Sequence, residues 1–467
     1  MATLTFHGAA QEVTGSCHLL QSPAVGRVLL DCGMHQGGDA VERIQDEVFP
    51  FDPASIDAVI LSHAHLDHSG LLPKLYHEGF RGPLICTTAT AELLDVMLHD
   101  SVGLYLRDLE RTNTRNARRG RPLIEPVFDM DDVAGVLGLC QGYRYREAIT
   151  LEAGAVVCFR DAGHILGSSI VEVTLQEKGE EKTLVFSGDL GKRDSVLMNE
   201  PAVLNKADVL LVESTYGDRE HRREEDSMSQ LRDILRDTWK RGGSVMIPAF
   251  AVGRTQDILF HLGCLHHQDE LDNWEVFLDS PMAIAVTRVY DRWLEMLDGD
   301  EVRQLSEAHK ASLETFLPTL NLAIETEESM AINRIKSGAI IIAGSGMCTG
   351  GRIRHHFKRR IWDDRNTIIF TGYQARGTLG RVIVDGAQNI KMFGDDYVVK
   401  AQVETLGGLS AHAGQSGLVD WITAFKPAPR TILVHGEARA QDGLADKLWK
   451  EHELKVEIPA RGDSIVF

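Results

Sequence analysis

Short hydrophobic runs separated by Gly-rich turns dominate the first 217 residues of the chain. Five of these runs predict buried strands: Arg27–Asp31, Ala58–Ser62, Ala155–Arg160, Thr183–Ser187 and Asp208–Glu213. The longer stretch Ala89–Leu109 has an apolar spacing closer to that of a helix. It runs into Arg107–Arg121, whose many arginines predict a loop without regular structure. This part of the chain therefore predicts a domain of mixed strands and helices.

The rhythm changes at about residue 218, where predicted strands begin to alternate with predicted helices. Helices are expected to start near Gly253, Met282 and Ile353. The strands are predicted at Ser244–Pro248, Glu275–Leu278, Ala339–Ala343 and Thr367–Thr371. Such alternation is typical of a parallel sheet covered by helices on both faces. After residue 400 the pattern predicts two further strands, one ending at His412 and one at His435.

Composition and charge narrow the class of protein. A chain of 467 residues has room for two or three domains, and its formal net charge of −19 argues against binding nucleic acid by whole-surface attraction. A local basic cleft remains compatible with that charge. No apolar run approaches the ~18 residues of a membrane span, and residues 1–17 lack the pattern of a signal peptide. The seven cysteines form no CxxC pair, which fits a protein of the reducing cytoplasm.

The strongest chemical signal is an HxHxDH motif that directly follows the predicted strand Ala58–Ser62. It comprises His63, His65, Asp67 and His68. Imidazole and carboxylate groups are good zinc ligands, and an i, i+2 pair beyond a strand can turn two imidazoles toward one ion. The aspartate and the last histidine of the motif can then reach a second ion nearby. The spacing therefore predicts a metal site.

Three further residues occupy the same kind of position, just after a hydrophobic run. His164 lies in DAGHILGSS, Asp189 in SGDLG and His435 in VHGE. Ligands at the carboxyl ends of strands are where layered α/β proteins normally build a site. Asp189 can bridge two ions, because a carboxylate has two oxygen atoms to offer. Asp31, at the end of its own strand, is expected to orient a ligand histidine from behind.

These residues together resemble the metallo-β-lactamase fold. Within that superfamily, Glu213 in ESTYG, His412 in SAH and His435 in VHGE resemble the β-CASP branch of nucleic-acid hydrolases. Its members include ribonuclease J and the endonuclease subunit of the cleavage and polyadenylation machinery. The resemblance also covers EVTGSC, PAFAVGR and GYQARGTLGR. It implies an α/β protein: an αββα metallo-β-lactamase sandwich built from residues 1–217 and 401–467, with a parallel-sheet β-CASP domain inserted at 218–400.

The resemblance also implies a set of roles for the site residues. One zinc ion would be held by His63, His65, His164 and Asp189. A second would be held by Asp67, His68, Asp189 and His435. Two such ions supply an activated water that attacks phosphorus, and the same ligands accept manganese. Asp67 and Asp31 count among the catalytic groups.

The departing 3′ oxygen of a cleaved phosphodiester needs a proton. His412 is the expected general acid, because the ordinary histidine pKa of ~6.5 suits proton transfer near neutral pH. Glu213 is the expected partner that keeps His412 oriented and protonated. His435 favours RNA, since the DNA-repair members of the family usually carry valine at this position. The predicted activity is zinc-dependent hydrolysis of single-stranded RNA, at a cleft between the two domains.

Phosphate contacts are expected where Gly-rich turns precede helices, at Ala249–Gly253 and Gly344–Gly351, because helix amino termini favour anions. The residues proposed for these contacts are Arg254, Ser345, Gly346, Arg352, Arg376 and Arg381. The stretch Arg107–Arg121 could guide RNA, although a run of charges is more often a solvated face.

Two other functions stay open at this point. The same core can carry a metallo-hydrolase of a small ester or thioester, which substrate assays would identify. A non-catalytic RNA-binding scaffold is the second alternative, and metal content would identify it. The sequence decides neither between endonuclease and 5′-exonuclease nor between monomer and homodimer.

Overall fold

The computed structural model describes residues 1–35, 40–177, 179–221, 224–294, 312–372, 374–375 and 377–467. Contacts within the chain divide it into two compact units. Unit 1 comprises Met1–Arg193, Asn199–Glu220 and His412–Phe467, and unit 2 comprises Asp194–Met198 and His221–Ala411. Unit 1 is therefore built from both ends of the chain, and most of unit 2 is one continuous insertion.

Unit 1 contains two seven-stranded sheets. In spatial order, the first consists of β22 (Ser464–Val466), β1 (Thr3–Phe6), β2 (His18–Ser22), β3 (Gly26–Leu30), β4 (Ala58–Ile60), β5 (Leu84–Thr87) and β6 (Cys140–Tyr143). The second consists of β21 (Val456–Glu457), β20 (Arg430–Val434), β11 (Val209–Glu213), β10 (Glu180–Phe186), β9 (Ser169–Glu177), β8 (Val156–Asp161) and β7 (Ala148–Thr150). Each sheet is part parallel and part antiparallel, and β3 to β6 and β10, β11, β20 and β21 are the parallel parts.

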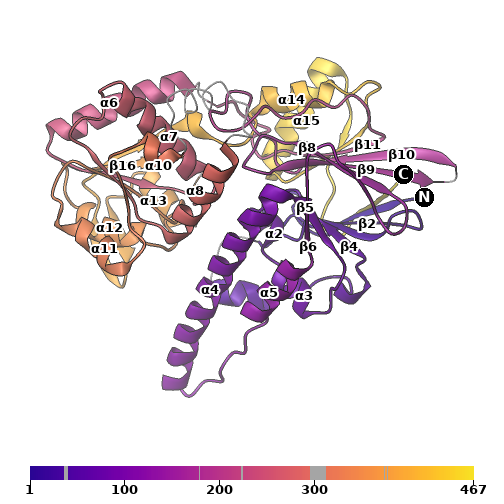
Figure 1. Cartoon of the computed structure of the whole chain (residues 1–467), viewed down its shortest axis with the longest axis horizontal. Helices are drawn as coiled ribbons and strands as arrows, with labels where there is room; N and C mark the ends of the chain where they lie inside the picture. The colour runs from indigo at the N-terminus through magenta and orange to yellow at the C-terminus, as the bar shows by residue number, and fades with distance from the viewer. Residues whose placement is uncertain (36–39, 178, 222–223, 295–311, 373, 376) are drawn as a thin grey trace. The chain divides into compact units, whose positions relative to one another are not determined.

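Helices cover the outer face of each sheet, as Figure 1 shows, with α14 and α15 on one side and α3, α4 and α5 on the other. The helices of unit 1 are α1 (Ala40–Asp46), α2 (Leu66–Ser69), α3 (Leu72–His77), α4 (Thr88–Arg118), α5 (Met130–Gly138), α14 (Gln415–Thr423) and α15 (Ala438–His452). One buried apolar cluster lies between the sheets, and a further cluster lies between each sheet and its helices. The predicted αββα sandwich is therefore confirmed.

The central strands are hydrophobic along their whole length because both of their faces are covered. Every residue of β11 is buried, from Val209 to Glu213, and so is every residue of β5. Such continuous burial is expected of parallel strands between two layers. Glu213 is the one charged residue of β11, and its carboxylate has no exposed surface although it lies at the end of a core strand.

Helix α4 corrects one prediction made from the sequence. The helix starts after Thr87, whose hydroxyl accepts a hydrogen bond from the Thr90 amide, and continues for 31 residues to Arg118. The prediction of an irregular loop from Arg107 is wrong, because the arginines in this stretch favour helix and Leu109 packs into the core. Only the residues from Arg119 onward form the connection to α5.

Unit 2 contains a parallel six-stranded sheet. In spatial order its strands are β14 (Leu320–Leu322), β13 (Glu275–Leu278), β15 (Ala339–Ala343), β12 (Val245–Pro248), β16 (Thr367–Phe370) and β19 (Gln402–Thr405). A two-stranded ribbon of β17 (Asn389–Met392) and β18 (Asp395–Val398) stands apart from it. Buried apolar clusters lie on both faces of the sheet, so the predicted parallel-sheet domain is confirmed.

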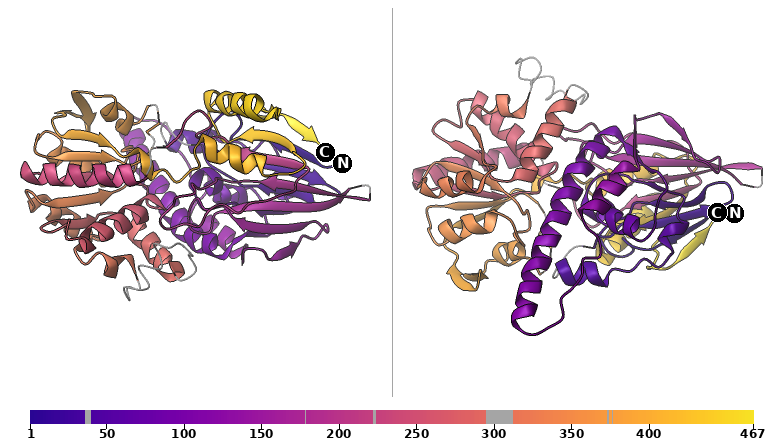
Figure 2. Two further views of the ribbon diagram at one scale, coloured as in Figure 1. Left: turned by 90° about the horizontal axis from the view of Figure 1, so that it is seen from above. Right: turned by 60° about the horizontal axis from the view of Figure 1, so that its bottom comes forward.

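Helices of unit 2 flank this sheet on both sides, as the turned views in Figure 2 show. They are α6 (Glu224–Lys240), α7 (Arg254–His267), α8 (Pro281–Trp293), α10 (Leu313–Phe316), α11 (Thr326–Ala331), α12 (Ile353–Arg360) and α13 (Leu379–Val384). The three predicted helix starts are confirmed to within one residue. The nine strands predicted before residue 400 are also present, with ends shifted by at most three residues.

The predicted strand ending at His412 is wrong. The strand in this region is β19, which ends at Thr405 and pairs with β16 in the sheet of unit 2. A short 3-10 helix, Gly407–Leu409, follows it and leads the chain to His412. His412 makes an isolated bridge with Gly191 of unit 1, so it belongs to the edge of that unit and not to a regular strand.

Candidate metal centre

The predicted ligands lie just beyond the carboxyl ends of strands in both sheets of unit 1. In the first sheet β4 leads to His63. In the second, β8 leads to His164, β10 to Asp189 and β20 to His435. Because β10, β11 and β20 run parallel in register, their carboxyl ends meet at one edge of the sheet. Residues far apart in the sequence therefore face one another.

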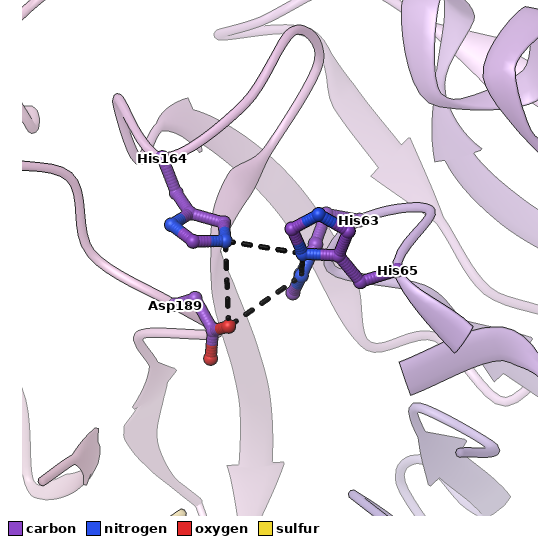
Figure 3. A group of neighbouring side chains, drawn as sticks. All are labelled: His63, His65, His164 and Asp189. Atoms are coloured by element: carbon purple, nitrogen blue, oxygen red, sulfur yellow. Dashed lines mark hydrogen bonds and ion pairs between the residues drawn. The ribbon is translucent and has the colours of Figure 1, made fainter. Parts of the chain in front are cut away.

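The first cluster consists of His63, His65, His164 and Asp189, whose side chains converge in Figure 3. His65 Nδ1 lies 3.1 Å from both His63 Nε2 and His164 Nε2. Asp189 Oδ2 is 3.6 Å from each of the same two Nε2 atoms. One ligand atom of each residue therefore lies within 4.8 Å of the others, which is the arrangement that a small cation requires.

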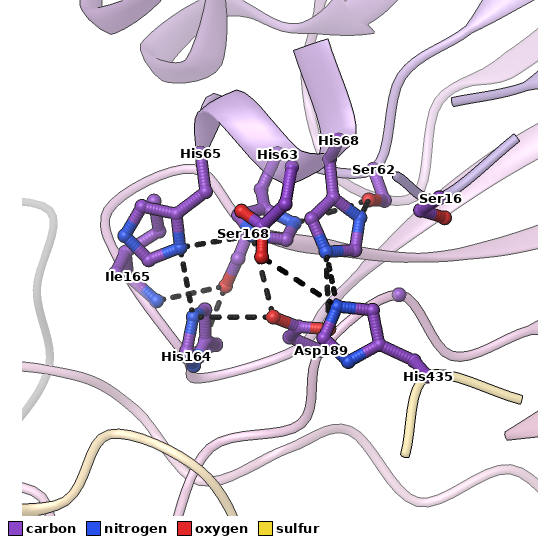
Figure 4. Close-up of polar contacts among 12 residues, drawn as sticks. Ser16, Ser62, His63, His65, His68, His164, Ile165, Ser168, Asp189 and His435 are labelled. Atoms are coloured by element: carbon purple, nitrogen blue, oxygen red, sulfur yellow. Dashed lines mark hydrogen bonds and ion pairs between the residues drawn. The ribbon is translucent and has the colours of Figure 1, made fainter. Parts of the chain in front are cut away.

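The second cluster consists of Asp67, His68, Asp189 and His435, and Figure 4 shows all but Asp67 by label. His68 Nε2 lies 3.0 Å from His435 Nε2. His435 Nε2 lies 3.8 Å from Asp67 Oδ2, while Asp189 Oδ1 is 3.4 Å from His68 Nε2 and 3.7 Å from His435 Nε2. The two carboxylate oxygens of Asp189 thus point to different groups of histidines.

Asp189 has an unusual environment for a buried carboxylate. Its side chain is 2% exposed, and Oδ1 accepts no hydrogen bond from any residue in the described part of the chain. A buried polar atom without a partner is costly, so such an atom is normally satisfied by something. A cation shared between Asp189 and the histidines would satisfy it, and a carboxylate with one oxygen toward each cluster can bridge two cations.

The pKa values of two of the histidines also fit a divalent cation. Burial lowers the pKa of His63 well below its ordinary value and lowers the pKa of His65 to about 4. Both imidazoles are therefore neutral at pH 7, with a lone pair available for coordination. Nitrogen and carboxylate oxygen atoms converging in this way are the donor set that zinc prefers. The residues present therefore fit a metal centre of one or two such ions.

A second layer of hydrogen bonds orients these ligands. Asp31 Oδ2 lies 2.7 Å from His68 Nδ1, and Oδ1 accepts a hydrogen bond of 2.8 Å from the Ser62 amide. The Ser62 hydroxyl lies 3.1 Å from His63 Nδ1. Asp31 and His435 both hold left-handed backbone, with φ values of 62° and 50°. Non-glycine residues adopt this conformation where the surroundings enforce it, often at functional sites.

His412 and Glu213 form a pair beside the two clusters. His412 Nδ1 lies 3.2 Å from Glu213 Oε2 and 3.9 Å from Asp189 Oδ2. Burial by itself lowers the pKa of His412, but the adjacent carboxylates outweigh this effect and raise it to about 9. The His412 side chain is 21% exposed, whereas Glu213 is fully buried. The imidazole is therefore protonated at neutral pH and reaches the surface of unit 1.

The sequence analysis missed three hydroxyl residues, although each lies within four positions of a predicted site residue. Thr215 donates to Glu213 Oε2 at 2.5 Å and lies 3.2 Å from His435 Nδ1. The Ser168 hydroxyl accepts a hydrogen bond from the His164 amide and so fixes the loop that carries this histidine. Ser62 directly precedes the motif. Nearness in sequence was the available signal, but serines and threonines are too common beside ligands to be selected on it.

The residues expected to contact phosphate fall within the sequence range of unit 2. Arg352 donates to Asp279 at 2.7 Å and to two backbone carbonyls, so its guanidinium is engaged within the unit. Arg381 pairs with Asp385, and the side chain of Arg254 is buried. The Ser345 hydroxyl accepts from the Gly350 amide, and Gly346 packs against Phe250, whose ring leaves no room for a Cβ atom. Arg376 lies outside the described residues, so these contacts stay predictions.

Comparison with known families agrees with the fold. Residues 11–166 match the metallo-beta-lactamase superfamily, residues 255–383 match the Beta-Casp domain and residues 396–459 match the Zn-dependent metallo-hydrolase RNA specificity domain. The first range contains the HxHxDH motif, and the last contains His412 and His435. Asp189 and Glu213 fall between the matched ranges, so their place in the site rests on the structure.

Relatives of known name extend over nearly the whole chain. The ribonuclease TTHA0252 of Thermus thermophilus is 41% identical over 92% of this chain and 92% of its own. The transcription termination factor FttA of Methanosarcina mazei is 31% identical over 98% of this chain and 70% of its own. An RNase J-like protein of Methanocaldococcus jannaschii is 29% identical and covers 99% of both chains.

Fold, site and relatives define a metallo-hydrolase of the metallo-β-lactamase superfamily. Within it, this chain belongs to the β-CASP family. The family and the hydrolase class predicted from the sequence are therefore confirmed. A separate observation concerns membranes: in the described ranges no helix has the length and apolar character needed to cross a bilayer.

Proposed function

We propose that this protein is a ribonuclease that hydrolyses phosphodiester bonds in single-stranded RNA with two zinc ions. His63, His65, His164 and Asp189 would hold one ion, and Asp67, His68, Asp189 and His435 the other. The division of the Asp189 oxygens between two groups of histidines is the observation that carries this proposal. When bound, the zinc ions would supply an activated water as the nucleophile for attack on phosphorus.

His412 supplies the second requirement of the reaction, a proton for the departing 3′ oxygen. The buried Glu213 carboxylate lies 3.2 Å from Nδ1 and favours the charged form of the imidazole. The Nε2 atom of the same ring would then donate the proton. Leu190 donates its amide to Glu213 Oε1 at 2.6 Å, so the carboxylate is itself held in place. This geometry fits a general acid with a positioning partner.

Three observations favour RNA as the polymer. One relative, 41% identical, is named a ribonuclease, and residues 396–459 match a domain named for RNA specificity. His435 is the third, because members of this family that act on RNA carry histidine here. We infer from them that single-stranded RNA is the substrate and that the protein acts in RNA processing or degradation in the cytoplasm.

The proposal is tested by cleavage of end-labelled single-stranded RNA beside DNA of matched sequence. Wild type, His412→Ala and the control His452→Ala, an exposed histidine on α15, are compared, with metal content measured on each. We expect RNA-selective cleavage by wild type and control, and a rate lower by ~10²-fold or more in His412→Ala with both metal ions retained. The product ladder separates endonuclease from exonuclease cleavage.

Each remaining outcome contradicts a defined part of the proposal. Loss of metal in His412→Ala would make His412 a ligand and not an acid. No cleavage of RNA by wild type holding two ions would favour a small ester or thioester as substrate. Wild type that binds RNA but holds no metal would favour the non-catalytic scaffold. Manganese in place of zinc would show directly in the metal analysis.

A further inference from the structure

The outer end of α4 is a feature that the proposed chemistry does not use. Leu109 is the last buried residue of this helix, yet the helix continues to Arg118. Figure 1 shows this end of α4 reaching past α3 and α5, which belong to the same unit. The last two turns of the helix and the residues that follow, 111–121, therefore lie on the surface of unit 1. We call residues 111–121 the α4 tip.

The α4 tip is strongly basic in a chain that is strongly acidic. Its sequence, RTNTRNARRGR, contains five arginines and no acidic residue, whereas the whole chain carries a formal charge of −19. Arg111 pairs with Asp108 at 3.1 Å. The other four arginines are exposed, and none of them contacts a carboxylate among the residues that the structure describes: Arg115, Arg118, Arg119 and Arg121. Their charge is available to a partner.

Hydrogen bonds hold the α4 tip in one conformation. The Asn113 side chain donates to the Ile124 carbonyl and accepts from the Ile124 amide, both at 2.8 Å. Asn116 donates to the Pro122 carbonyl at 3.3 Å, and Gln45 from α1 donates to the Glu125 carbonyl at 2.7 Å. The returning chain is thus fastened to the helix. A fixed backbone presents the arginines without the entropic cost of ordering a loop on binding.

The other end of the same helix is attached to the metal centre. The hydroxyls of Thr87 and Thr90 both donate to the Gly167 carbonyl, at 2.7 and 2.8 Å, in the loop that carries His164. Thr90 and Arg115 are 25 positions apart on α4, a length of about 38 Å at about 1.5 Å per residue. A single strand of about 11 stacked nucleotides covers that distance, or fewer if the bases are unstacked.

We propose that Arg115, Arg118, Arg119 and Arg121 form a binding site for the phosphates of single-stranded RNA, remote from the metal centre. This inference rests on the proposed ribonuclease function. Guanidinium groups bind phosphate oxygens through two parallel hydrogen bonds, and such contacts supply most sequence-independent affinity for nucleic acid. Stable protein interfaces have an apolar centre, whereas the α4 tip offers only Ala117 as an apolar side chain, so its chemistry favours a polyanion over a folded protein.

If the α4 tip binds RNA, the effect of changing it should depend on the length of the RNA. An RNA of six nucleotides is too short to join the metal centre to the α4 tip, whereas one of 30 nucleotides joins both. The test variant is Arg118→Glu/Arg119→Glu. The control is Arg334→Glu/Lys336→Glu in unit 2, where both side chains are exposed and without a carboxylate partner among the described residues. Each pair of substitutions lowers the net charge by 4, so a general effect of charge is the same in both.

We expect the tip variant to raise KM for the 30-nucleotide RNA by about tenfold while kcat and the KM for the six-nucleotide RNA stay unchanged. The control variant should match wild type on both. With a phosphorothioate 30-mer that resists cleavage, the slope of log affinity against log salt should fall by about 1.4, or about 0.7 for each lost phosphate contact. Circular dichroism and the melting temperature confirm that both variants fold.

Several outcomes would overturn the inference. One is equal affinity of wild type and tip variant for the 30-mer, and another is an equal rise in KM for the short and the long RNA. An equal rise in KM in the control variant would mean that the effect comes from net charge alone. Competition by polyglutamate as strong as by RNA would favour an acidic protein partner. If wild type binds the 30-mer through the tip but cleaves no RNA, the binding site stands and the proposed ribonuclease function fails.

Discussion

Two buried aspartates, one in each unit, follow strands of parallel pairs but have opposite surroundings. Asp279 follows β13 in unit 2 and has no exposed surface. Arg352 donates to Oδ1 at 2.7 Å, Ser329 to Oδ2 at 2.7 Å, and His356 Nε2 lies 2.6 Å from Oδ2. Both oxygens of Asp279 are thus satisfied by the protein itself.

Asp189 follows β10 in unit 1 and is almost as deeply buried, but its ion-pair partners among the described residues are histidines and not an arginine. Its contacts with histidine nitrogens are 3.4 to 3.9 Å long, and Oδ1 accepts no hydrogen bond from the described chain. The comparison shows that burial of a carboxylate alone does not mark a functional site. A structural carboxylate such as Asp279 has both oxygens hydrogen-bonded by neighbouring side chains. At a candidate metal site such as Asp189, the carboxylate and the histidine nitrogens around it are directed at a common point instead.

Asp189→Asn should give the largest effect, because it removes the group that faces both clusters. We expect loss of both metal ions. The cleavage rate should fall by more than the ~10²–10³-fold that is typical of deleting one electrostatic contact. The metal-free protein should stay folded, since Asn keeps the shape of the side chain and Oδ1 accepts no hydrogen bond in the described chain. Elemental analysis, cleavage assays and thermal unfolding in a chelator measure the three quantities. Retained metal would contradict the bridging role.

Asp279→Asn should have the opposite profile. Removal of one partner from a buried charged cluster typically costs about 3–5 kcal/mol, because Arg352 is left without its counter-charge. We expect the free energy of unfolding to fall by that amount while the folded protein keeps its metal. Urea unfolding and metal analysis of the same sample provide the test. A stable variant that loses metal would contradict the comparison, because Asp279 would then support metal binding and not stability.

Asp31→Ala should have an intermediate effect, because Asp31 contacts His68 and would act on the metal only through this histidine. Loss of such an orienting carboxylate typically lowers metal affinity or activity by about 10–100-fold. The readout is a zinc titration with a competing chelator, and Asp31→Asn serves as the conservative comparison. Affinity equal to wild type in both variants would remove Asp31 from the site.

The smallest expected effect is on stability and comes from His35, which forms ion pairs with two carboxylates of unit 1. It lies 3.3 Å from Glu12 and 3.1 Å from Glu47, and these two carboxylates raise the pKa of His35 to about 9. Because the folded pKa is raised, the contribution to stability is complete below the unfolded pKa of about 6.5. It is lost as the pH rises through about 9.

His35→Gln should therefore abolish a stability change of about 1 kcal/mol between pH 6.5 and 9, the size expected of a partly exposed ion pair. Thermal unfolding of wild type and variant across this pH range measures it, with the metal content held constant. An identical slope in both proteins would assign the pH dependence to another group.

Local pattern was sufficient to predict most of the fold. Continuous apolar runs such as Ala339–Ala343 predicted strands, because parallel strands covered on both faces must be hydrophobic throughout. The same reasoning failed for Arg107–Arg118, because this stretch has too few apolar residues to show a helical period. It is nevertheless helical, with Leu109 buried and Asn113 hydrogen-bonded to the returning chain. The reasoning also misplaced the strand before His412, since strand pairing is decided by distant segments.

The sequence by itself determined the ligand chemistry, because the HxHxDH spacing and the positions after strands are local properties of the chain. Only the tertiary structure decided how these residues meet. His68 and His435 lie 367 positions apart, yet their Nε2 atoms are 3.0 Å apart, and Arg352 is committed to Asp279, which no spacing indicates. The physical reason is that hydrophobic periodicity records which face of an element is buried, whereas the partners of a buried polar atom depend on which elements pack against it.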